Sequence, residues 1–418
     1  MLHLARLKIP EKQVERVTER IGQERVEQRA TEVQAFLELP VVEKFAAAVA
    51  HPPALAVVEM DGGRIQIREE SKGTAAAAVP GAVEGGGVAT APRSAAAGPA
   101  GAEAVVATDW AAAGPAEAET RAGHWREDKI GLLMTMTSAE SAADPCPTIP
   151  ETFVNPLRII KLARELKKGR AAGADAVADP PESEGDGASE SPEYTPPAVR
   201  VKSMVATRQE AESFGKMLAA AARARGFYGA KRKAFVADGA ETNWTIQQRW
   251  FSDFVAILDF IHALSYVFAA AMAGRGFAAG WEVYVRWIGW VWQGRVAEVI
   301  KELEQRQAEV GMPAADESES SPKQVVADTL RYLRNNQHRM RYDEYRRLGL
   351  PITSSQVEST VKQFNRRVKG TEKFWSEAGA ETLLQLRADY LSETEPMEKF
   401  WEDRQEKATG RRRYRRAI

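Results

Sequence analysis

The chain has 418 residues, of which 44% are hydrophobic and 10 are tryptophan, so it can bury a large core as one domain with insertions or as two smaller domains. Its formal net charge of -1 hides local segregation, because residues 322–350 and 410–416 are basic while residues 171–199 are acidic. Overall charge therefore says nothing about a nucleic-acid partner, whereas the local charge permits one. The single cysteine, Cys146, excludes an intramolecular disulfide and a cysteine-rich zinc site within these residues.

Nothing in the sequence predicts an association with a membrane. The N-terminus lacks the apolar core and the cleavage site of a secretory signal. The longest apolar run, residues 264–273, is too short to span a bilayer. We therefore expect a soluble intracellular protein without a membrane partner.

The first part of the chain predicts a helix followed by strands. Residues 1–50 form the expected helical N-terminal segment, which is either a solvated helix or an element for dimerisation or DNA contact. Residues 54–60 are apolar and predict a buried strand, followed by an Asp61-Gly62-Gly63-Arg64 turn. Residues 65–68 alternate like the returning strand of a hairpin, so Asp61 is either a turn residue or part of a site.

Two low-complexity stretches interrupt this part of the sequence. Residues 72–120 are dominated by Ala, Gly and Pro, and residues 171–199 are acidic and rich in Pro, so we expect both to be disordered insertions. Between them, residues 124–138 predict the third strand of the antiparallel set and residues 153–168 predict a helix. Residues 207–225 predict another helix.

The second half of the chain alternates strands and helices before becoming helical. Residues 233–239 predict a strand that ends in Asp238, and residues 254–260 predict a second buried strand after a short helix. Two such strands joined by a helix predict parallel pairing through a right-handed crossover. Further helices are predicted for residues 281–310, whose tryptophans we assign to the core, and for residues 323–348 and 379–391.

The order of these elements matches a ribonuclease H-like α/β fold, in which a mixed sheet is interrupted by an all-α insertion. On this interpretation the catalytic core consists of residues 51–263 and 351–395. The all-α insertion occupies residues 264–350, and a basic C-terminal tail occupies residues 396–418.

A basic helix is predicted within residues 351–375. Thr353, Ser354 and Ser355 are hydroxyl residues that can accept hydrogen bonds from the first N–H groups of this helix. Its face carries Glu358 and, at i+4, Lys362. A carboxylate on a basic helix suits a metal ion that faces a polyphosphate chain, although a solvated amphipathic helix has the same pattern.

Three acids occupy comparable places in this predicted fold. Asp61 ends the first strand, Asp238 ends the first strand after the antiparallel set, and Glu358 lies on the final helix, so all three are expected at one rim of the sheet. Hard divalent cations such as Mg²⁺ prefer oxygen ligands. Two such ions can activate a nucleophilic oxygen and stabilise the leaving oxygen of an in-line displacement.

Several stretches of the sequence resemble the DDE transposases of bacterial insertion sequences, and among them the ISKra-type group. These stretches are DGGR from Asp61, VADGAETNW around Asp238, LDFIH ending at His262, and PITSSQVESTVKQFNRRVKGTEKFW around Glu358. HWREDKIGLLMTM and DPCPTIP are similar to the same group. The resemblance covers most of residues 55–401, with the two low-complexity insertions as interruptions.

This resemblance implies a fold, an activity and a catalytic triad. The fold is ribonuclease H-like with an all-α insertion, for which the 120 residues from Asp238 to Glu358 leave room. The activity is metal-dependent cleavage of DNA at element ends, followed by attack of the exposed 3′-OH on target DNA. The implied triad is Asp61, Asp238 and Glu358, and the implied metal is Mg²⁺ or Mn²⁺. The implied partners are double-stranded DNA and at least one further copy of the chain, in a bacterial cytoplasm and at the nucleoid when bound.

Other residues have expected supporting roles. The resemblance implies that His262 hydrogen bonds to a phosphate near the cleaved bond or to a catalytic carboxylate. The alternative is a histidine buried in the core. Asp259 can cap the helix that follows it. Arg64, Lys362 and three further residues are expected to contact DNA phosphates, the alternative being a solvated basic face. The three further residues are Arg366, Arg367 and Lys369.

The sequence also departs from the pattern of this family. The residues ahead of the first strand contain no helix-turn-helix or zinc pattern, which leaves a truncated N-terminus open. The alternatives to an active transposase are therefore an inactive or domesticated DNA-binding derivative and a metal-dependent nuclease that does not join DNA.

Overall fold

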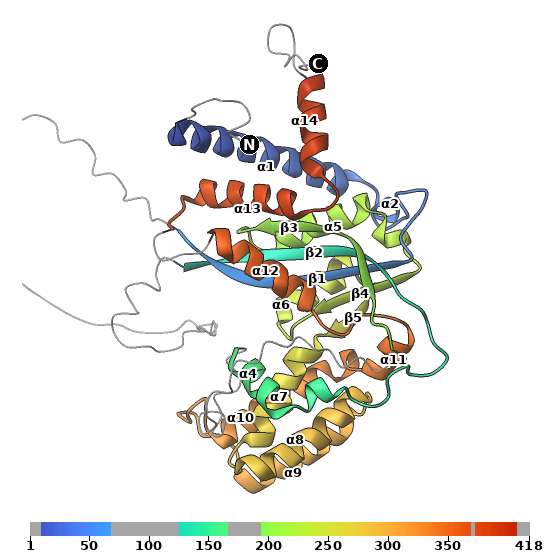
Figure 1. Ribbon diagram of the computed structural model, residues 1–418, viewed down its shortest axis with the longest axis vertical. Coiled ribbons are helices and arrows are strands. Elements are labelled where there is room, and N and C mark those ends of the chain that lie inside the picture. The colour runs from blue at the N-terminus through green and yellow to red at the C-terminus, as the bar shows by residue number, and fades with distance from the viewer. Residues whose placement is uncertain (1–9, 68–124, 166–193, 369–372, 408–418) are drawn as a thin grey trace, which may run out of the picture.

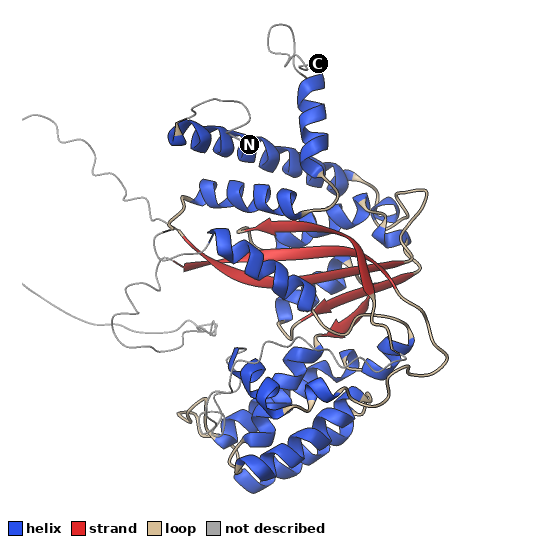
Figure 2. Ribbon diagram, in the orientation of Figure 1, coloured by secondary structure: helices blue, strands red, loops and turns tan. Residues whose placement is uncertain are grey.

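The structure is a computed structural model that describes residues 10–67, 125–165, 194–368 and 373–407. At its centre lies a mixed sheet of five strands in the order β3-β2-β1-β4-β5 (Figure 2). The strands are β1 (Leu55–Gln66), β2 (Trp125–Thr137), β3 (Ala198–Thr207), β4 (Arg232–Ala237) and β5 (Val255–Leu258). The middle of the sheet is apolar, and four consecutive residues of β1 from Leu55 are fully buried.

The pairing of β1 differs on its two edges. On one edge it pairs antiparallel with β2 along its whole length, from Leu55↔Met136 to Gln66↔Trp125. On the other edge it pairs parallel with β4, and this ladder ends at Glu59↔Val236. The second half of β1 therefore extends past β4, beyond the end of the parallel ladder.

Helices cover both faces of the sheet (Figure 1). On one face, α5 (Ala211–Ala224) packs against β2 and β3, with α6 (Glu241–Trp250) beside it. On the other face, α12 (Ser355–Val368) packs against β1 and α13 (Glu377–Leu391) packs against β3. The long helix α1 (Glu11–Glu38) lies against α13 and α5. A buried ion pair from Arg25 Nε to Asp389 Oδ2, at 2.8 Å, joins α1 to α13.

A helical unit adjoins the β5 end of the sheet and is visible at the bottom of Figure 1. It contains α7 (Phe260–Met272), α8 (Phe277–Trp292), α9 (Val296–Val310), α10 (Pro322–Asn336) and α11 (Tyr342–Arg347). The connection from β2 packs on the same unit through α4 (Pro156–Glu165). Trp292 Nε1 donates to the Cys146 carbonyl at 2.7 Å, so residues remote in sequence complete this unit. The remaining described helices are α2 (Val41–Lys44), α14 (Pro396–Glu406) and the 3₁₀ turns Glu151–Phe153, Phe227–Gly229 and Gln337–Arg339.

The predicted hairpin around Asp61 is wrong. Residues 55–66 form one continuous strand, and the Asp-Gly-Gly sequence lies inside it because β2 pairs along the whole segment. A side chain at Gly63 would place its Cβ only 2.8 Å from Asp128 Oδ1, so the close approach of β2 accounts for this glycine. Residues 125–137 consequently form the second strand of the antiparallel set, not the third.

Three other predictions need correction or fall outside the described residues. The sequence interpretation missed β3, whose first two residues had been assigned to the acidic insertion. The predicted single helix over residues 281–310 is two helices, because Gly294 adopts a left-handed φ of 72° between them. The expected basic tail begins with the helix α14. Residues 72–120 and most of 171–199, which we expected to be disordered insertions, lie outside the described residues.

Two tryptophans of α8 lie in the core as expected, since Trp287 and Trp292 are 1% and 2% exposed. Within the described residues, no helix combines the length and the apolarity needed to cross a lipid bilayer.

Candidate active site

Two of the predicted acids lie at one rim of the sheet. Asp61 comes two positions after Glu59, the last residue of β1 that pairs with β4. Asp238 directly follows the last residue of β4. Because β1 and β4 are adjacent and parallel, both acids lie beyond the end of the same ladder. Both are half-buried.

The Asp238 carboxylate is held by the chain that follows it. Its Oδ1 accepts hydrogen bonds from the Ala240 N–H at 2.9 Å and from Asn243 Nδ2 at 2.7 Å. These bonds form a turn that leads into α6 and fix one oxygen of the carboxylate. Asn243 therefore orients Asp238 from the first turn of a helix.

The third acid, Glu358, is brought to the same rim by α12. Val357, the residue before it, donates its N–H to Glu59 Oε2 at 2.9 Å. Ser354, just ahead of the helix, donates its N–H to Asp259 Oδ1 at 3.1 Å. Two buried carboxylates from the sheet region therefore fix the start of α12, where the sequence had predicted hydroxyl caps from residues 353–355. Glu59 is 1% exposed, and nothing in the sequence interpretation assigned it a role.

The pKa values of the acids reflect their crowding. Burial raises the pKa of Asp61, the hydrogen bond from the Gly62 N–H lowers it, and the charge of Asp238 raises it further. Burial also raises the pKa of Glu358, to which the charges of Asp259 and Asp61 add. The charge of Asp61 thus acts on Glu358, and that of Asp238 acts on Asp61, whereas the group of ligand atoms within 4.8 Å of one another contains Glu358 but neither Asp61 nor Asp238. Crowded, partly desolvated carboxylates favour either protonation or the binding of a cation.

Glu358 has spare capacity to bind a ligand. Its Oε1 is buried and has no hydrogen-bond partner among the described residues. Buried polar atoms without partners are uncommon in folded proteins and mark positions where an ion, water or ligand is expected. The carboxylate of Glu358 is therefore suited to coordinate a metal ion.

Asp259 and His262 form a hydrogen-bonded pair beside Glu358. Asp259 is fully buried and caps α7, as predicted, by accepting from the Ile261 and His262 N–H groups. Its Oδ2 lies 2.6 Å from His262 Nδ1. Burial opposes the charged imidazole, but the hydrogen bond and charge of Asp259, with those of Asp238 and Glu358, raise the pKa of His262 to about 9.

A metal ion could be held by one group of side chains at this site. Ligand atoms of Asp259, His262 and Glu358 lie within 4.8 Å of one another. Both oxygens of Asp259 already accept hydrogen bonds, so its main role in this arrangement is to orient His262 and the start of α12. Glu358 is shared by this group and by the predicted triad.

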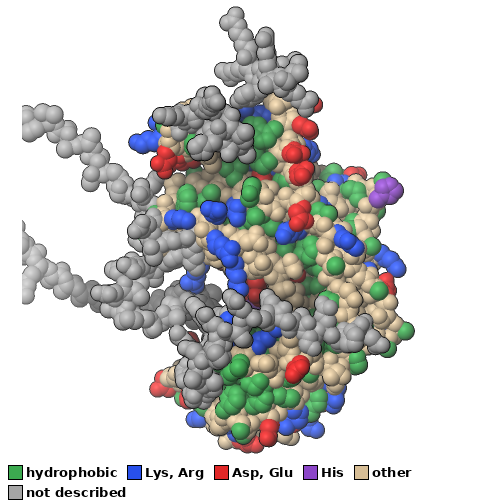
Figure 3. Space-filling view, in the orientation of Figure 1, with side chains coloured by type: hydrophobic (Ala, Val, Ile, Leu, Met, Phe, Trp, Pro, Cys, Tyr) green, Lys and Arg blue, Asp and Glu red, His purple; other side chains and the backbone are tan. Residues whose placement is uncertain are grey.

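The predicted DNA-contacting residues lie on two elements, β1 and α12. Arg64 is exposed on β1, and Lys362, Arg366 and Arg367 are exposed on α12. Lys and Arg side chains gather over α12 and α13 in the space-filling view (Figure 3). Lys369, the fifth predicted residue, lies outside the described residues.

Sequence reasoning missed Glu59, although a signal was present. An acid within an otherwise apolar strand is costly to bury, and the period of two along a strand places Glu59 on the same face as Asp61. That combination predicts a buried acid beside the site.

Comparison with known proteins adds no relative. No family model, curated protein or solved structure matches the chain.

Proposed function

We propose that this protein is a DNA transposase of the DDE type, which cleaves DNA at insertion-sequence ends and joins the exposed 3′-OH to target DNA. The observation that carries the proposal is that Asp61 and Asp238 lie beyond the end of the β1–β4 ladder, while Glu358 lies on α12, the helix that packs across β1. These are the three residues that the motif resemblance selects from the sequence. Nothing in their local sequences requires them to meet.

The strand order supports a ribonuclease H-like identity for the fold. The β3-β2-β1 part is antiparallel, and β4 and β5 continue the sheet in parallel, as the predicted layout requires. Helices α7 to α11 follow β5 and precede Glu358, within the interval where the resemblance implies an all-α insertion.

The side chains fit a hard divalent cation such as Mg²⁺ or Mn²⁺. Asp61, Asp238 and Glu358 would supply carboxylate oxygens, and the unpartnered Oε1 of Glu358 offers one that is already buried. When bound, such ions activate the attacking oxygen and stabilise the leaving oxygen in phosphoryl transfer. A bound cation would offset the burial and the repulsion between neighbouring acids that together raise the pKa values of Asp61 and Glu358.

The other residues of the site position these carboxylates and the DNA. Asn243 fixes one oxygen of Asp238, and Glu59 fixes the helix end that carries Glu358. His262, held protonated by Asp259, can donate a hydrogen bond to a DNA phosphate. Lys362 and its basic neighbours on α12 can neutralise further phosphates, which positions DNA without reading its sequence.

The test is a strand-transfer assay with duplexes taken from the DNA on either side of the gene, nicked in advance to expose 3′-OH ends. We expect joined products that require Mg²⁺ or Mn²⁺, and we expect Asp238→Asn to abolish joining while DNA binding persists. Glu282→Gln, which changes an exposed acid of α8, is the matched control and should join normally. Full joining by Asp238→Asn would refute the proposed mechanism.

The same assay separates the alternative functions. Cleaved DNA without joined products would indicate a metal-dependent nuclease. DNA binding without any product at any metal concentration would indicate an inactive derivative.

A further inference from the structure

Basic side chains from two helices lie next to one another on the outer side of α12 and α13. Lys362, Arg366 and Arg367 are exposed on α12. Arg387 of α13 is half-buried beside them, and its Nη2 donates to the Gln363 carbonyl of α12 at 3.4 Å. Lys and Arg side chains gather over both helices in Figure 3. We call Lys362, Arg366, Arg367 and Arg387 the α12–α13 basic surface.

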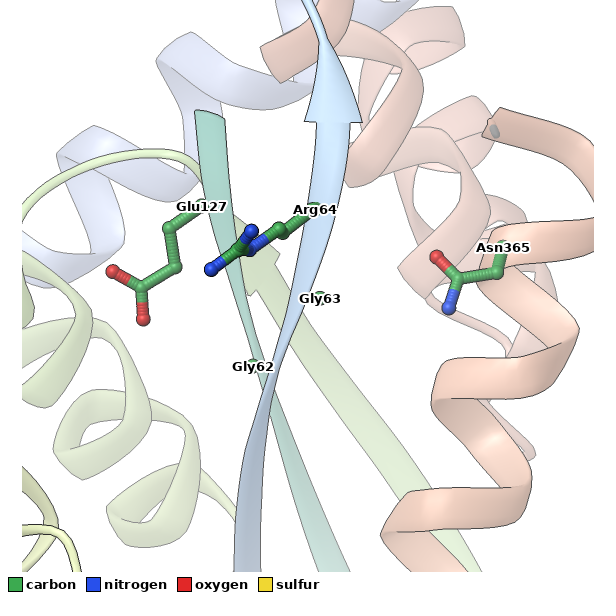
Figure 4. A pocket seen from close by; sticks show the side chains of 5 residues that line it. All are labelled: Gly62, Gly63, Arg64, Glu127 and Asn365. Atoms are coloured by element: carbon green, nitrogen blue, oxygen red, sulfur yellow. The ribbon is translucent and has the colours of Figure 1, made fainter. Parts of the chain in front are cut away.

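Arg64, the basic residue on β1, does not belong to this surface. It lines a pocket of about 400 Å³ together with Glu127 of β2 and Asn365 of α12. In Figure 4 its guanidinium reaches across β2 toward Glu127, whose carboxylate also pairs with Lys129 at 3.3 Å. An acid therefore lies on the side to which Arg64 points.

Two guanidinium groups of the α12–α13 basic surface repel each other. Partial burial lowers the pKa of Arg387, and the neighbouring charge of Arg367 lowers it further. Among the described residues, no carboxylate forms an ion pair with either group. Like charges held together without an acid are stabilised when an anion binds beside them. The forked N–H donors of arginine fit a phosphate group in particular.

An exposed tyrosine completes this position. The central guanidinium carbon of Arg387 lies 5.3 Å from the centroid of the Tyr390 ring, and Tyr390 is 77% exposed. The ring and the Gln363 carbonyl together restrict the orientations of Arg387, so less side-chain entropy is lost when it binds an anion. The Tyr390 hydroxyl is a further donor of the kind that contacts DNA phosphates.

Lys362 connects the surface to the candidate active site. It lies one turn after Glu358, and its charge opposes the burial that raises the pKa of that acid. Arg367 lies nine residues after Glu358, which is about 13.5 Å along the helix axis. Phosphates of one strand of a duplex follow each other about every 3.4 Å along its axis, so this rise spans about four base pairs.

We propose that the α12–α13 basic surface binds the sugar-phosphate backbone of the duplex whose end lies at the candidate active site, with Arg367 and Arg387 holding a phosphate about four base pairs from that end. The inference rests on the proposed function for its substrate, DNA. It adds a contact from α13, through Arg387, to the contacts already proposed for α12. Such a contact positions the duplex without reading its sequence.

The first test measures the binding of a duplex of random sequence by fluorescence anisotropy in EDTA at several salt concentrations. We expect Arg387→Gln to weaken binding and to lower the salt dependence by about one unit on logarithmic axes, because one phosphate contact is lost. Arg387→Lys keeps the positive charge and should retain the wild-type salt dependence. Arg249→Gln, which changes an exposed arginine of α6 on the opposite face of the sheet, is the matched control and should bind as wild type does.

The second test locates the contact on the DNA. Single neutral methylphosphonates replace the phosphates of the pre-nicked duplexes from either side of the gene, one position at a time. We expect wild-type protein to bind less tightly when the replaced phosphate lies about four base pairs from the 3′-OH. The same replacement should cause no loss of affinity in Arg387→Gln.

Three results would overturn the inference. One is a wild-type salt dependence in Arg387→Gln, and another is an equally reduced salt dependence in Arg387→Lys, which is expected if the residue acts only on structure. The third is an equal loss of affinity in wild type and Arg387→Gln for every methylphosphonate. Each of these leaves the proposed function intact, since joining is tested separately by Asp238→Asn. A salt dependence lowered as expected, without any metal-dependent joining, would sustain the DNA-binding surface and refute the proposed function.

Discussion

Glu59 offers a direct test of how the candidate active site is assembled, because one buried hydrogen bond connects it to the helix that carries Glu358. Its Oε2 accepts from the Val357 N–H at 2.9 Å, and the side chain is 1% exposed. Glu59→Leu would keep the site apolar but leave that N–H without an acceptor. Glu59→Gln would keep an acceptor of nearly the same shape and remove the charge.

The expected magnitudes follow from this contact. A buried backbone donor left without a partner costs about 1–3 kcal/mol. For a chain of this size, the unfolding entropy is large enough that each kcal/mol lowers the melting temperature by only about 1–2 °C. Glu59→Leu should therefore melt about 1–5 °C below wild type, whereas Glu59→Gln should be at least as stable as wild type at neutral pH.

The charge of Glu59 adds a dependence on pH. Burial raises the pKa of Glu59 well above 4.5, and Asp259 and Glu358 add to the increase although the Val357 hydrogen bond opposes it. The folded state therefore binds more protons than the unfolded state above pH 4.5, so the stability of wild type falls as pH rises from there toward the raised pKa. Glu59→Gln lacks this group, and its advantage over wild type should grow over the same range.

The assay is thermal unfolding of the three proteins in EDTA across this pH range, followed by strand transfer in Mg²⁺. We expect Glu59→Leu to lose joining as well as stability, because the start of α12 and hence Glu358 is displaced. Equal stability of Glu59→Leu and Glu59→Gln at neutral pH would refute the assigned role of the hydrogen bond. Loss of joining in the stable Glu59→Gln variant would instead indicate that the carboxylate itself acts in the reaction.

Three further predictions concern separate parts of the molecule. Asp259→Asn should lower the pKa of His262 from about 9 toward its ordinary value of 6.5, as measured by NMR titration in EDTA. An unchanged pKa would contradict the hydrogen bond between Asp259 and His262. Asp389→Ala should destabilise the protein by about 3–5 kcal/mol in chemical denaturation, because it leaves Arg25 buried without its carboxylate. Lys362→Gln should weaken DNA binding similarly for all sequences and lower the salt dependence by about one unit on logarithmic axes, whereas an unchanged slope would exclude a phosphate contact.

Local sequence patterns locate Asp238 and Glu358 on their elements more readily than they locate the strands of the sheet. Asp238 follows an apolar run and Glu358 lies on a basic helix, so local patterns suffice to place both. The Asp61 segment has the local signature of a turn, but pairing with β2 keeps it extended, and that pairing depends on residues more than sixty positions away. The residues around Asp61 alone therefore could not reveal that pairing with β2 overrides their preference for a turn.

The missed strand β3 has a related explanation. It lies at an edge of the sheet, and its first half alternates exposed and half-buried positions that include Arg200 and Lys202. Such charges resemble those of a solvated linker when only the sequence is known. The hydrogen bond of Glu59 to the start of α12 depends on the packing of α12 across β1, which no local pattern specifies.

The central claim is that Asp61, Asp238 and Glu358 form one cation-binding site, and Mn²⁺ binding followed by electron paramagnetic resonance tests it most directly. We expect wild-type protein to bind Mn²⁺, and we expect Asp61→Asn, Asp238→Asn and Glu358→Gln each to weaken the affinity about tenfold or more. Glu282→Gln, at an exposed position on α8, should bind as wild type does. Wild-type Mn²⁺ affinity in all three site variants would contradict the claim.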